Sequence, residues 1–231
     1  GGVSTGYKAP RVDQLYSGIN GVTRQGKDLT YGNSNLNPEE STNYETGVYY
    51  NADNGFSANA TIFYNDYKDK IESESLGASS SRPINIGKAE TKGLEFGTNI
   101  PIIESLNLKA SYTYMESEQK NGKNKGEPFA NTPKHSLNAT LNWDINAKLS
   151  TWLKGEYKSA RQVFTEKYEN LSVANKARYD QVGTEINAYE LFHLGANYKW
   201  DKDLTFSATI YNLFDKNLYK HEPYTYTSGT P

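Results

Sequence analysis

The chain has 231 residues, a formal net charge of −2 at pH 7 and no cysteine. Its mean hydropathy is −0.80, and no run of about 18 apolar residues exists, so a transmembrane helix is not expected. The lack of cysteine excludes disulfides, thiolate nucleophiles and zinc–cysteine sites, and the near-neutral charge offers no basic field for nucleic acid.

The clearest pattern lies in residues 136–145, where odd positions are apolar and even positions are polar. Successive side chains of a strand point to opposite faces, so this segment is predicted to be a strand with one apolar and one polar face. The alternation recurs along nearly the whole chain, with Tyr and Trp near strand ends. Such repetition predicts a barrel whose outside contacts lipid and whose inside contacts water.

In chain order the pattern predicts nine strands, at residues 1–8, 43–50, 56–72, 84–100, 106–119, 136–145, 149–163, 188–200 and 204–219. Four connections of about three to five residues alternate with loops of roughly ten to thirty, among them a Ser-rich loop at 73–83 and long loops at 120–134 and 164–187. Outer-membrane barrels have short periplasmic turns and long extracellular loops. The predicted fold class is therefore all-β, a transmembrane antiparallel β-barrel.

Two local features are expected to serve the scaffold. Gly93 precedes an outward-facing Leu94, and a glycine there relieves a bend or a close approach in the sheet. The segment Asn212–Asp215 is expected to end the bilayer-spanning part of its strand.

The ends of the chain suggest a segment of a larger protein. Residues 1–7 have the pattern of the middle of a strand, and residues 225–231 have that of a loop cut short. We therefore expect residues 1–231 to be part of one barrel domain whose remaining strands lie elsewhere.

Six short motifs, in this order along the chain, carry a family resemblance: GYKAP at 6–10, QLY at 14–16, GNSNLNPE at 32–39, FYNDYKDKI at 63–71, NIGKA at 85–89 and YNLFDKNLY at 211–219. Together they resemble the C-terminal half of a TonB-dependent outer-membrane receptor, and the resemblance covers essentially the whole chain. Within that family, residues 7–10, 65–72, 92–95 and 99–101 are most similar to catecholate siderophore receptors of the enterobactin and colicin type.

The resemblance implies a barrel of 22 strands around an N-terminal plug, in the outer membrane of a Gram-negative bacterium. The ligand would bind extracellular loops and plug, and the TonB protein would supply energy through a short N-terminal box. The plug, the box, the early strands and the final strand would lie outside this chain. Another siderophore, haem or cobalamin remains an alternative ligand, and colicins or phage are possible further partners.

The long loops are the expected place of ligand contact. A ferric tris-catecholate carries three negative charges and flat aromatic rings, so cations and aromatic faces would bind it. The candidate contacts are Tyr16, Arg24, Lys27, Tyr31, Arg161, Phe164, Lys167, Tyr168, Arg178 and Tyr179. The iron would arrive fully coordinated, so neither a cofactor nor protein metal ligands are expected. The three histidines, His135, His193 and His221, show no ligand spacing, and His193 falls on the polar face of its strand.

Two other classes of protein are alternatives to a TonB-dependent receptor. A passive porin would have fewer strands and no plug. A soluble β-rich binding module would bury its apolar rows, so that Leu137, Leu141, Trp143 and Ile210 would face another sheet. No nucleophile elbow, P-loop, HExxH or dinucleotide motif occurs, so nothing in the sequence supports catalysis.

Overall fold

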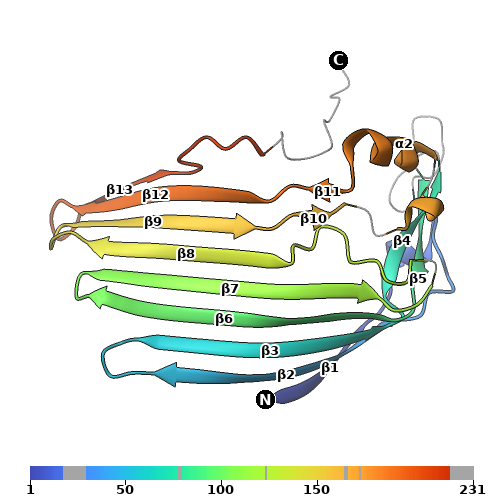
Figure 1. The fold of residues 1–231 in the computed structure, drawn as a ribbon, viewed down its shortest axis with the longest axis horizontal. Helices are drawn as coiled ribbons and strands as arrows, with labels where there is room; N and C mark the ends of the chain where they lie inside the picture. Colours follow the sequence, from blue (N-terminus) through green and yellow to red (C-terminus); the bar gives the residue numbers. More distant parts are fainter. Residues whose placement is uncertain (18–29, 78–79, 123, 164–165, 172, 219–231) are drawn as a thin grey trace.

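The structure is a computed structural model that describes residues 1–17, 30–77, 80–122, 124–163, 166–171 and 173–218. Its main element is a nine-stranded antiparallel sheet with the order β1-β2-β3-β6-β7-β8-β9-β12-β13 (Figure 1). The strands are β1 Gly2–Lys8, β2 Glu39–Asn51, β3 Ser57–Lys68, β6 Ala89–Ile103, β7 Leu106–Gln119, β8 His135–Asp144, β9 Leu149–Lys158, β12 Tyr189–Lys199 and β13 Thr205–Ile210. The number and order of the predicted strands are thus confirmed. β1 and β13 are the edges, and over the described residues the sheet is open.

The short connections lie at one end of the sheet and the long ones at the other (Figure 1). Asparagine and aspartate build the short turns: the Asn146 Oδ1 accepts backbone N–H bonds from Lys148 and Leu149, and the Asp201 Oδ1 accepts one from Leu204 at 2.9 Å. These side-chain bonds satisfy turn amides that have no strand partner. We call the two ends the turn end and the loop end.

Smaller elements lie in the long connections. They are α1 Val12–Leu15, β4 Ile71–Gly77, β5 Ser80–Asn85, β10 Arg161–Gln162, the 3-10 helix η1 Tyr168–Asn170, α2 Val173–Val182 and β11 Glu185–Ile186. No helix in the described part of the chain is long and apolar enough to cross a membrane.

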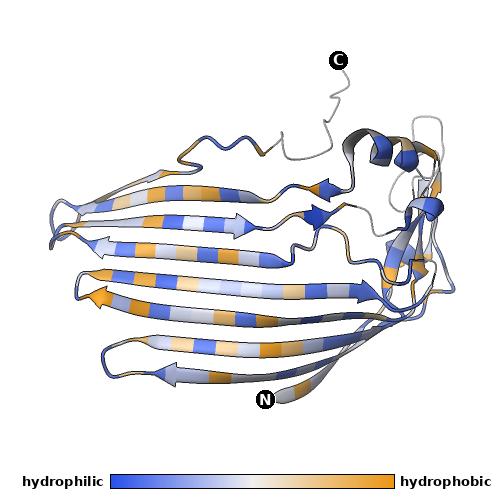
Figure 2. Ribbon diagram, in the orientation of Figure 1, coloured by the Kyte–Doolittle hydropathy of each residue, from blue (hydrophilic) through white to orange (hydrophobic). Residues whose placement is uncertain are grey.

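The register gathers the apolar rows of all strands on one face of the sheet. Ile62 pairs with Leu94, which pairs with Tyr114, and Tyr112 pairs with Leu137. Cross-strand partners share a face, so this apolar face is continuous across the sheet. Figure 2 shows the resulting alternation of hydrophobic and hydrophilic positions along the strands.

This apolar face is exposed. Leu137 is 41%, Trp143 46% and Ile210 55% accessible, and no large side chain among the described residues is fully buried. The burial required by a soluble binding module is therefore not found in the described sheet. An exposed apolar face of this extent indicates contact with lipid or another apolar partner.

Several predicted strand ends were wrong, because residues with positive φ interrupt the alternation. The predicted strand 56–72 stops at Lys68, since Asp69 has φ 54°. Residues 71–85, expected as strand ends around a Ser-rich loop, form the β4–β5 hairpin instead. Gly87, with φ 80°, separates this hairpin from β6.

The observed ends of the last strands also differ from the predicted ones. The strand expected at 149–163 ends at Lys158 and is followed by the short β10, and the loop expected at 164–187 contains α2. The final strand ends at Ile210 rather than at 219, because Asn212 has φ 51° and its side chain bonds the backbone of Lys216. The strand thus ends two residues before Asn212–Asp215, and the expectation that this segment ends the bilayer-spanning part stays a prediction.

Candidate functional site

The connection 9–38 is held against the β4–β5 hairpin. Tyr31 donates its N–H to Ser81 O at 2.8 Å, and the Asn33 side-chain amide donates to Pro83 O at 3.0 Å. Asn85 joins both parts, since its Oδ1 accepts the Asn37 N–H at 2.8 Å and its Nδ2 donates to Asn37 O at 3.0 Å. The part of this long loop that leads into β2 is thus fixed to the hairpin at the loop end.

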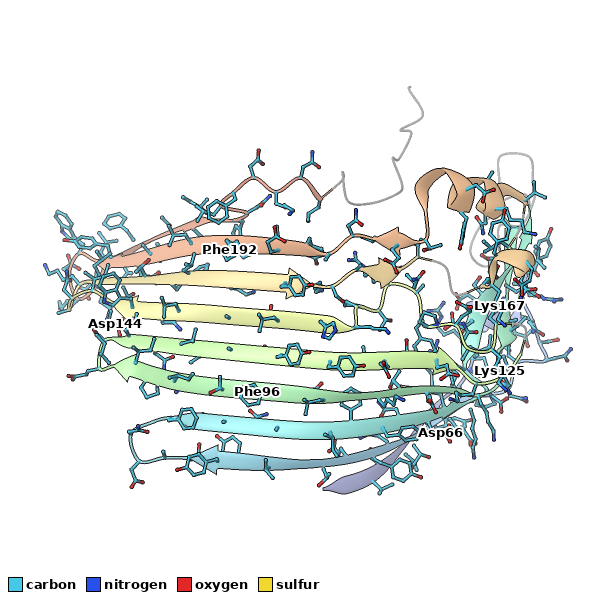
Figure 3. All side chains as sticks on the ribbon, viewed as in Figure 1. Asp66, Phe96, Lys125, Asp144, Lys167 and Phe192 are labelled. Atoms are coloured by element: carbon cyan, nitrogen blue, oxygen red, sulfur yellow. The ribbon has the colours of Figure 1, made fainter. Side chains whose placement is uncertain are left out.

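A second set of bonds joins the connections 120–134 and 159–188. The Asn124 Oδ1 accepts hydrogen bonds from the Lys167 N–H at 3.2 Å and from the Asn170 side chain at 3.1 Å. The Asn131 N–H donates to Gln162 O at 2.7 Å. Figure 3 shows Lys125 and Lys167 near each other at the loop end, while Asp144 lies at the turn end. Two long loops therefore meet over the end of the sheet.

The predicted ligand contacts fall into two groups. Tyr16 and Tyr31 belong to the connection 9–38, which is fixed to the hairpin. Lys167 directly precedes η1, Tyr168 is the first residue of η1, and Tyr179 lies in α2. Arg24, Lys27 and Phe164 lie outside the described residues, and of Arg178 only the backbone in α2 is described. The described candidates therefore lie at the loop end of the sheet, and their contact with a ligand stays a prediction.

The Lys167–Tyr168–Tyr179 group lines a cavity of about 330 Å³. The two tyrosine rings meet edge to face at 4.8 Å between centroids. The Tyr168 hydroxyl donates to Asp180 at 3.1 Å, and this bond raises the pKa of the tyrosine. Three carboxylates, Glu127, Glu166 and Glu169, also line the cavity. Lys167 is the one basic residue among the described lining residues. The three carboxylates therefore make this cavity unfavourable for a ligand with three negative charges.

Arg161 has the surroundings that an anion site requires. Its guanidinium carbon lies 5.7 Å from the centroid of the Tyr189 ring, a cation–π arrangement. Its Nη1 is buried and has no hydrogen-bond partner in the described part of the chain. Tyr189 is paired with Lys158, on the face opposite the apolar rows. A guanidinium beside an aromatic ring combines positive charge with a flat apolar face, the two features expected of a contact with an anionic aromatic group.

A second cation–aromatic pair was missed by sequence reasoning. Lys70 lies 4.6 Å from the centroid of Phe129, and Tyr67 contacts the same ring at 6.3 Å. Burial lowers the pKa of Lys70, although nearby Glu39 opposes the shift, and Lys70 is already ion-paired with Glu72. Alternation places Tyr67 on the polar face and could have identified it, whereas Lys70 and Phe129 meet only through loop folding.

His193 lies on the polar face, as predicted, opposite Lys154. Its Nδ1 accepts the Asn212 N–H at 3.0 Å, and its Nε2 lies 3.7 Å from a Glu156 oxygen. These contacts fix the end of β13 rather than form a ligand site.

An up-and-down sheet with an exposed apolar face, a polar opposite face, short turns at one end and long loops at the other defines the wall of an outer-membrane β-barrel. A family model described as "TonB dependent receptor-like, beta-barrel" matches residues 1–213. The chain belongs to this family of TonB-dependent receptors, and its strands lie in the outer membrane. The resemblance found in the sequence is confirmed.

Known relatives agree with this assignment. The chain is 34% identical to the iron-regulated outer membrane virulence protein of Vibrio cholerae over 94% of its own length and 33% of the relative. It is 31% identical to the ferric enterobactin receptor PirA of Pseudomonas aeruginosa, over 95% of the chain and 30% of the relative. The chain thus spans about a third of the length of the curated relatives it matches.

A solved structure shows the same arrangement of strands. The ferric enterobactin receptor of Pseudomonas aeruginosa, a variant in complex with enterobactin, superimposes with a TM-score of 0.72 at 28% sequence identity. The superposition covers 93% of this chain and 32% of that receptor.

Proposed function

We propose that the intact protein containing this chain binds and imports a ferric siderophore of the catecholate type, driven by TonB. The observation that carries the proposal is the pair formed by Arg161 of β10 and Tyr189, which lies on the inner face of the barrel wall. The buried Nη1 of Arg161 has no hydrogen-bond partner among the described residues, and its guanidinium carbon lies 5.7 Å from the centroid of an aromatic ring. Three relatives are named as ferric enterobactin or ferrienterobactin receptors, which supports the same ligand class.

The chemistry follows from the charge and shape of the ligand. A ferric tris-catecholate offers anionic oxygens to the guanidinium and flat rings to the tyrosine. The iron is cargo and arrives coordinated, so the protein supplies charge and aromatic surface rather than metal ligands. TonB would act through the plug and its N-terminal box, and outer-membrane lipid would surround the wall. Neither nucleic acid nor catalysis enters this mechanism.

The test is the affinity of the intact receptor for ferric enterobactin, with Arg161→Ala and Tyr189→Ala made singly. We expect each change to weaken binding about tenfold, which corresponds to about 1.4 kcal/mol. Arg82→Ala is the matched control, because the Arg82 guanidinium is already paired with Glu74 at 2.9 Å. Equal affinity in the two site variants and the control would remove the pair from the mechanism.

A separate variant tests the loop residues. Arg24, Lys27 and Arg178 are changed together to Ala, and the same affinity is measured. A loss of binding supports their role in attracting the trianion, and unchanged affinity removes them from the site. If the wild-type receptor binds haem or cyanocobalamin but not ferric enterobactin, the ligand class itself is wrong.

A further inference from the structure

The inner face of the sheet divides into an acidic half and a basic half. The inward rows of β2, β3 and β6 carry three glutamates and neither lysine nor arginine. The inward rows of β7, β8, β9 and β12, which lie side by side in Figure 1, carry three lysines and one glutamate between the loop end and Trp152. The glutamates are Glu39, Glu45 and Glu95 in the acidic half and Glu156 in the basic half, and the lysines are Lys109, Lys154 and Lys158. An anion that moves along this wall is therefore attracted to the basic half.

Lys109 is a cation in the middle of the basic half. In the register it lies opposite Thr140, which lies opposite Lys154 on the next strand. Neighbouring strands are about 4.8 Å apart, so the two lysines stand about 10 Å apart on the same face, with Thr140 between them. Lys109 is exposed and has no hydrogen bond or ion pair within the described part of the chain. Its charge is therefore available to a ligand in the lumen.

Lys154 and Glu156 balance each other. The Lys154 ammonium forms an ion pair with the Glu156 carboxylate, and the His193 Nε2 lies 3.7 Å from the same carboxylate. Glu156 lies on the loop-end side of Lys154 and therefore further from Lys109. The acid of the basic half is thus already compensated, and the free charge of the middle row is that of Lys109.

Trp152 supplies an aromatic surface directly below this row. It follows Lys154 on the inward side of β9 towards the turn end, and it lies opposite Gly195 of β12. A Cβ atom on Gly195 would lie 2.3 Å from the indole ring, so the ring occupies the space that a side chain would take. Glycine at this position therefore lets the indole lie against the wall, on the same face as the two lysines.

This arrangement repeats the chemistry of the Arg161–Tyr189 pair deeper in the wall. Tyr189 lies opposite Lys158, and Trp152 is about 20 Å from Lys158 along β9, at about 3.3 Å per residue. At both places an aromatic ring of the inward face lies beside a basic side chain. A ligand that the upper pair binds therefore meets a second place of the same kind on its way to the turn end.

We propose that Lys109, Lys154 and Trp152 form a transit site for the anionic catecholate cargo, on the inner wall between the Arg161–Tyr189 pair and the turn end. The ammonium groups attract the catecholate oxygens, and the indole contacts a catechol ring. Lys154 stays shared with Glu156, which keeps the contact weak enough for release. The inference rests on the proposed function, because it takes the same ligand class as cargo.

The experiment compares binding with import, in cells whose receptor for ferric enterobactin is the intact protein. The double variant Lys109→Gln/Trp152→Leu is expected to keep the affinity for ferric enterobactin and to lower the maximal rate of radioactive iron uptake about tenfold. The variant Lys109→Arg/Trp152→Phe preserves the charge and the ring, so import close to the wild-type rate is expected. Glu95→Gln, in the acidic half, is the matched control and is expected to change neither quantity. Uptake is expressed per receptor in the outer membrane.

Four results would overturn the transit site. The first is uptake by the Lys109→Gln/Trp152→Leu variant at the wild-type rate, and the second is an equal loss in the conservative variant. The third is a fall in affinity as large as the fall in uptake, which would assign these residues to initial binding. The fourth is faster hydrogen exchange within the plug, which would assign them to plug contact. A wild-type receptor that neither binds nor imports ferric enterobactin would refute the proposed function and the transit site with it, whereas the first result refutes the transit site alone.

Discussion

At the scale of single residues, Gly93 illustrates how close the strands approach. A Cβ atom at this position would lie 2.1 Å from the Tyr114 carbonyl oxygen and 2.6 Å from the Phe63 ring. Real Cβ contacts do not reach such distances, and one of the two groups is backbone that cannot turn aside. The expected scaffold role of Gly93 is therefore confirmed as a steric one.

We predict that Gly93→Ala destabilises the intact barrel by about 1–3 kcal/mol, because the strands must separate to admit the methyl group. The measurement is urea unfolding in lipid vesicles, followed by tryptophan fluorescence. Gly155→Ala is the comparison, since its Cβ would meet only the Phe192 side chain, at 3.2 Å. This contact is longer and is with a side chain rather than with backbone, so a smaller effect is expected. Equal effects of the two changes would contradict the steric account.

At the scale of elements, the order of the loops depends on a few amide side chains. Asn85 connects three segments, because its side chain bonds both the N–H and the carbonyl of Asn37 and also donates to Asp69 O. It therefore couples the β4–β5 hairpin to the end of the connection 9–38 and to the break after β3. Loss of these bonds leaves three backbone groups without partners.

We predict that Asn85→Ala increases amide hydrogen exchange at Asn37 and Tyr31 at least tenfold while the sheet keeps its protection. The control is Asn99→Ala, which removes one bond to Gly55 O at the turn end. Mass spectrometry of peptic fragments from the intact protein reports both regions. Unchanged exchange at Asn37 would show that the hairpin does not hold the loop.

Sequence alternation identified the nine strands because one face of each strand meets an apolar environment and the other meets water. Side chains alternate between these faces, so apolar and polar residues alternate in the sequence. It misplaced the ends beyond the apolar band, where both faces meet water and the pattern carries no information. Asp69 and Asn212 end their strands through positive φ, which a sequence does not reveal for a residue other than glycine. The β4–β5 hairpin lies beyond the apolar band as well, so the alternation did not predict it.

The candidate site was less predictable than the sheet. Arg161 was identified from its charge and its position beside a long loop, but its partner Tyr189 lies 28 residues further along and is brought near by the β9–β12 pairing. Lys70 and Phe129 come from different connections and meet only in three dimensions. Residue type therefore suggested the chemistry, while topology decided which residues meet.

At the scale of the whole molecule, the sheet separates membrane lipid on its apolar face from water on its polar face. Leu141 lies on the apolar face, paired with Leu108 and Leu153. Its sequence neighbour Thr140 points to the opposite face, paired with Lys109 and Lys154. Both positions lie near the middle of β8, so the two differ mainly in the environment that their side chains enter. The pair therefore allows the two faces to be compared at one depth.

We predict that Leu141→Arg destabilises the intact barrel by about 2–4 kcal/mol, the range found for a basic residue near the bilayer midplane. The matched change Thr140→Arg places the same side chain on the inner, polar face. Water can solvate it there, but it faces Lys109 and Lys154, so a smaller effect of about 1 kcal/mol is expected from like-charge repulsion. Urea unfolding in vesicles measures both free energies. Repeating the pair in vesicles of shorter acyl chains is expected to reduce only the Leu141→Arg effect, because a thinner bilayer lets the guanidinium reach water. A larger effect for Thr140→Arg would reverse the assignment of the two faces, and with it the inward position of Tyr189.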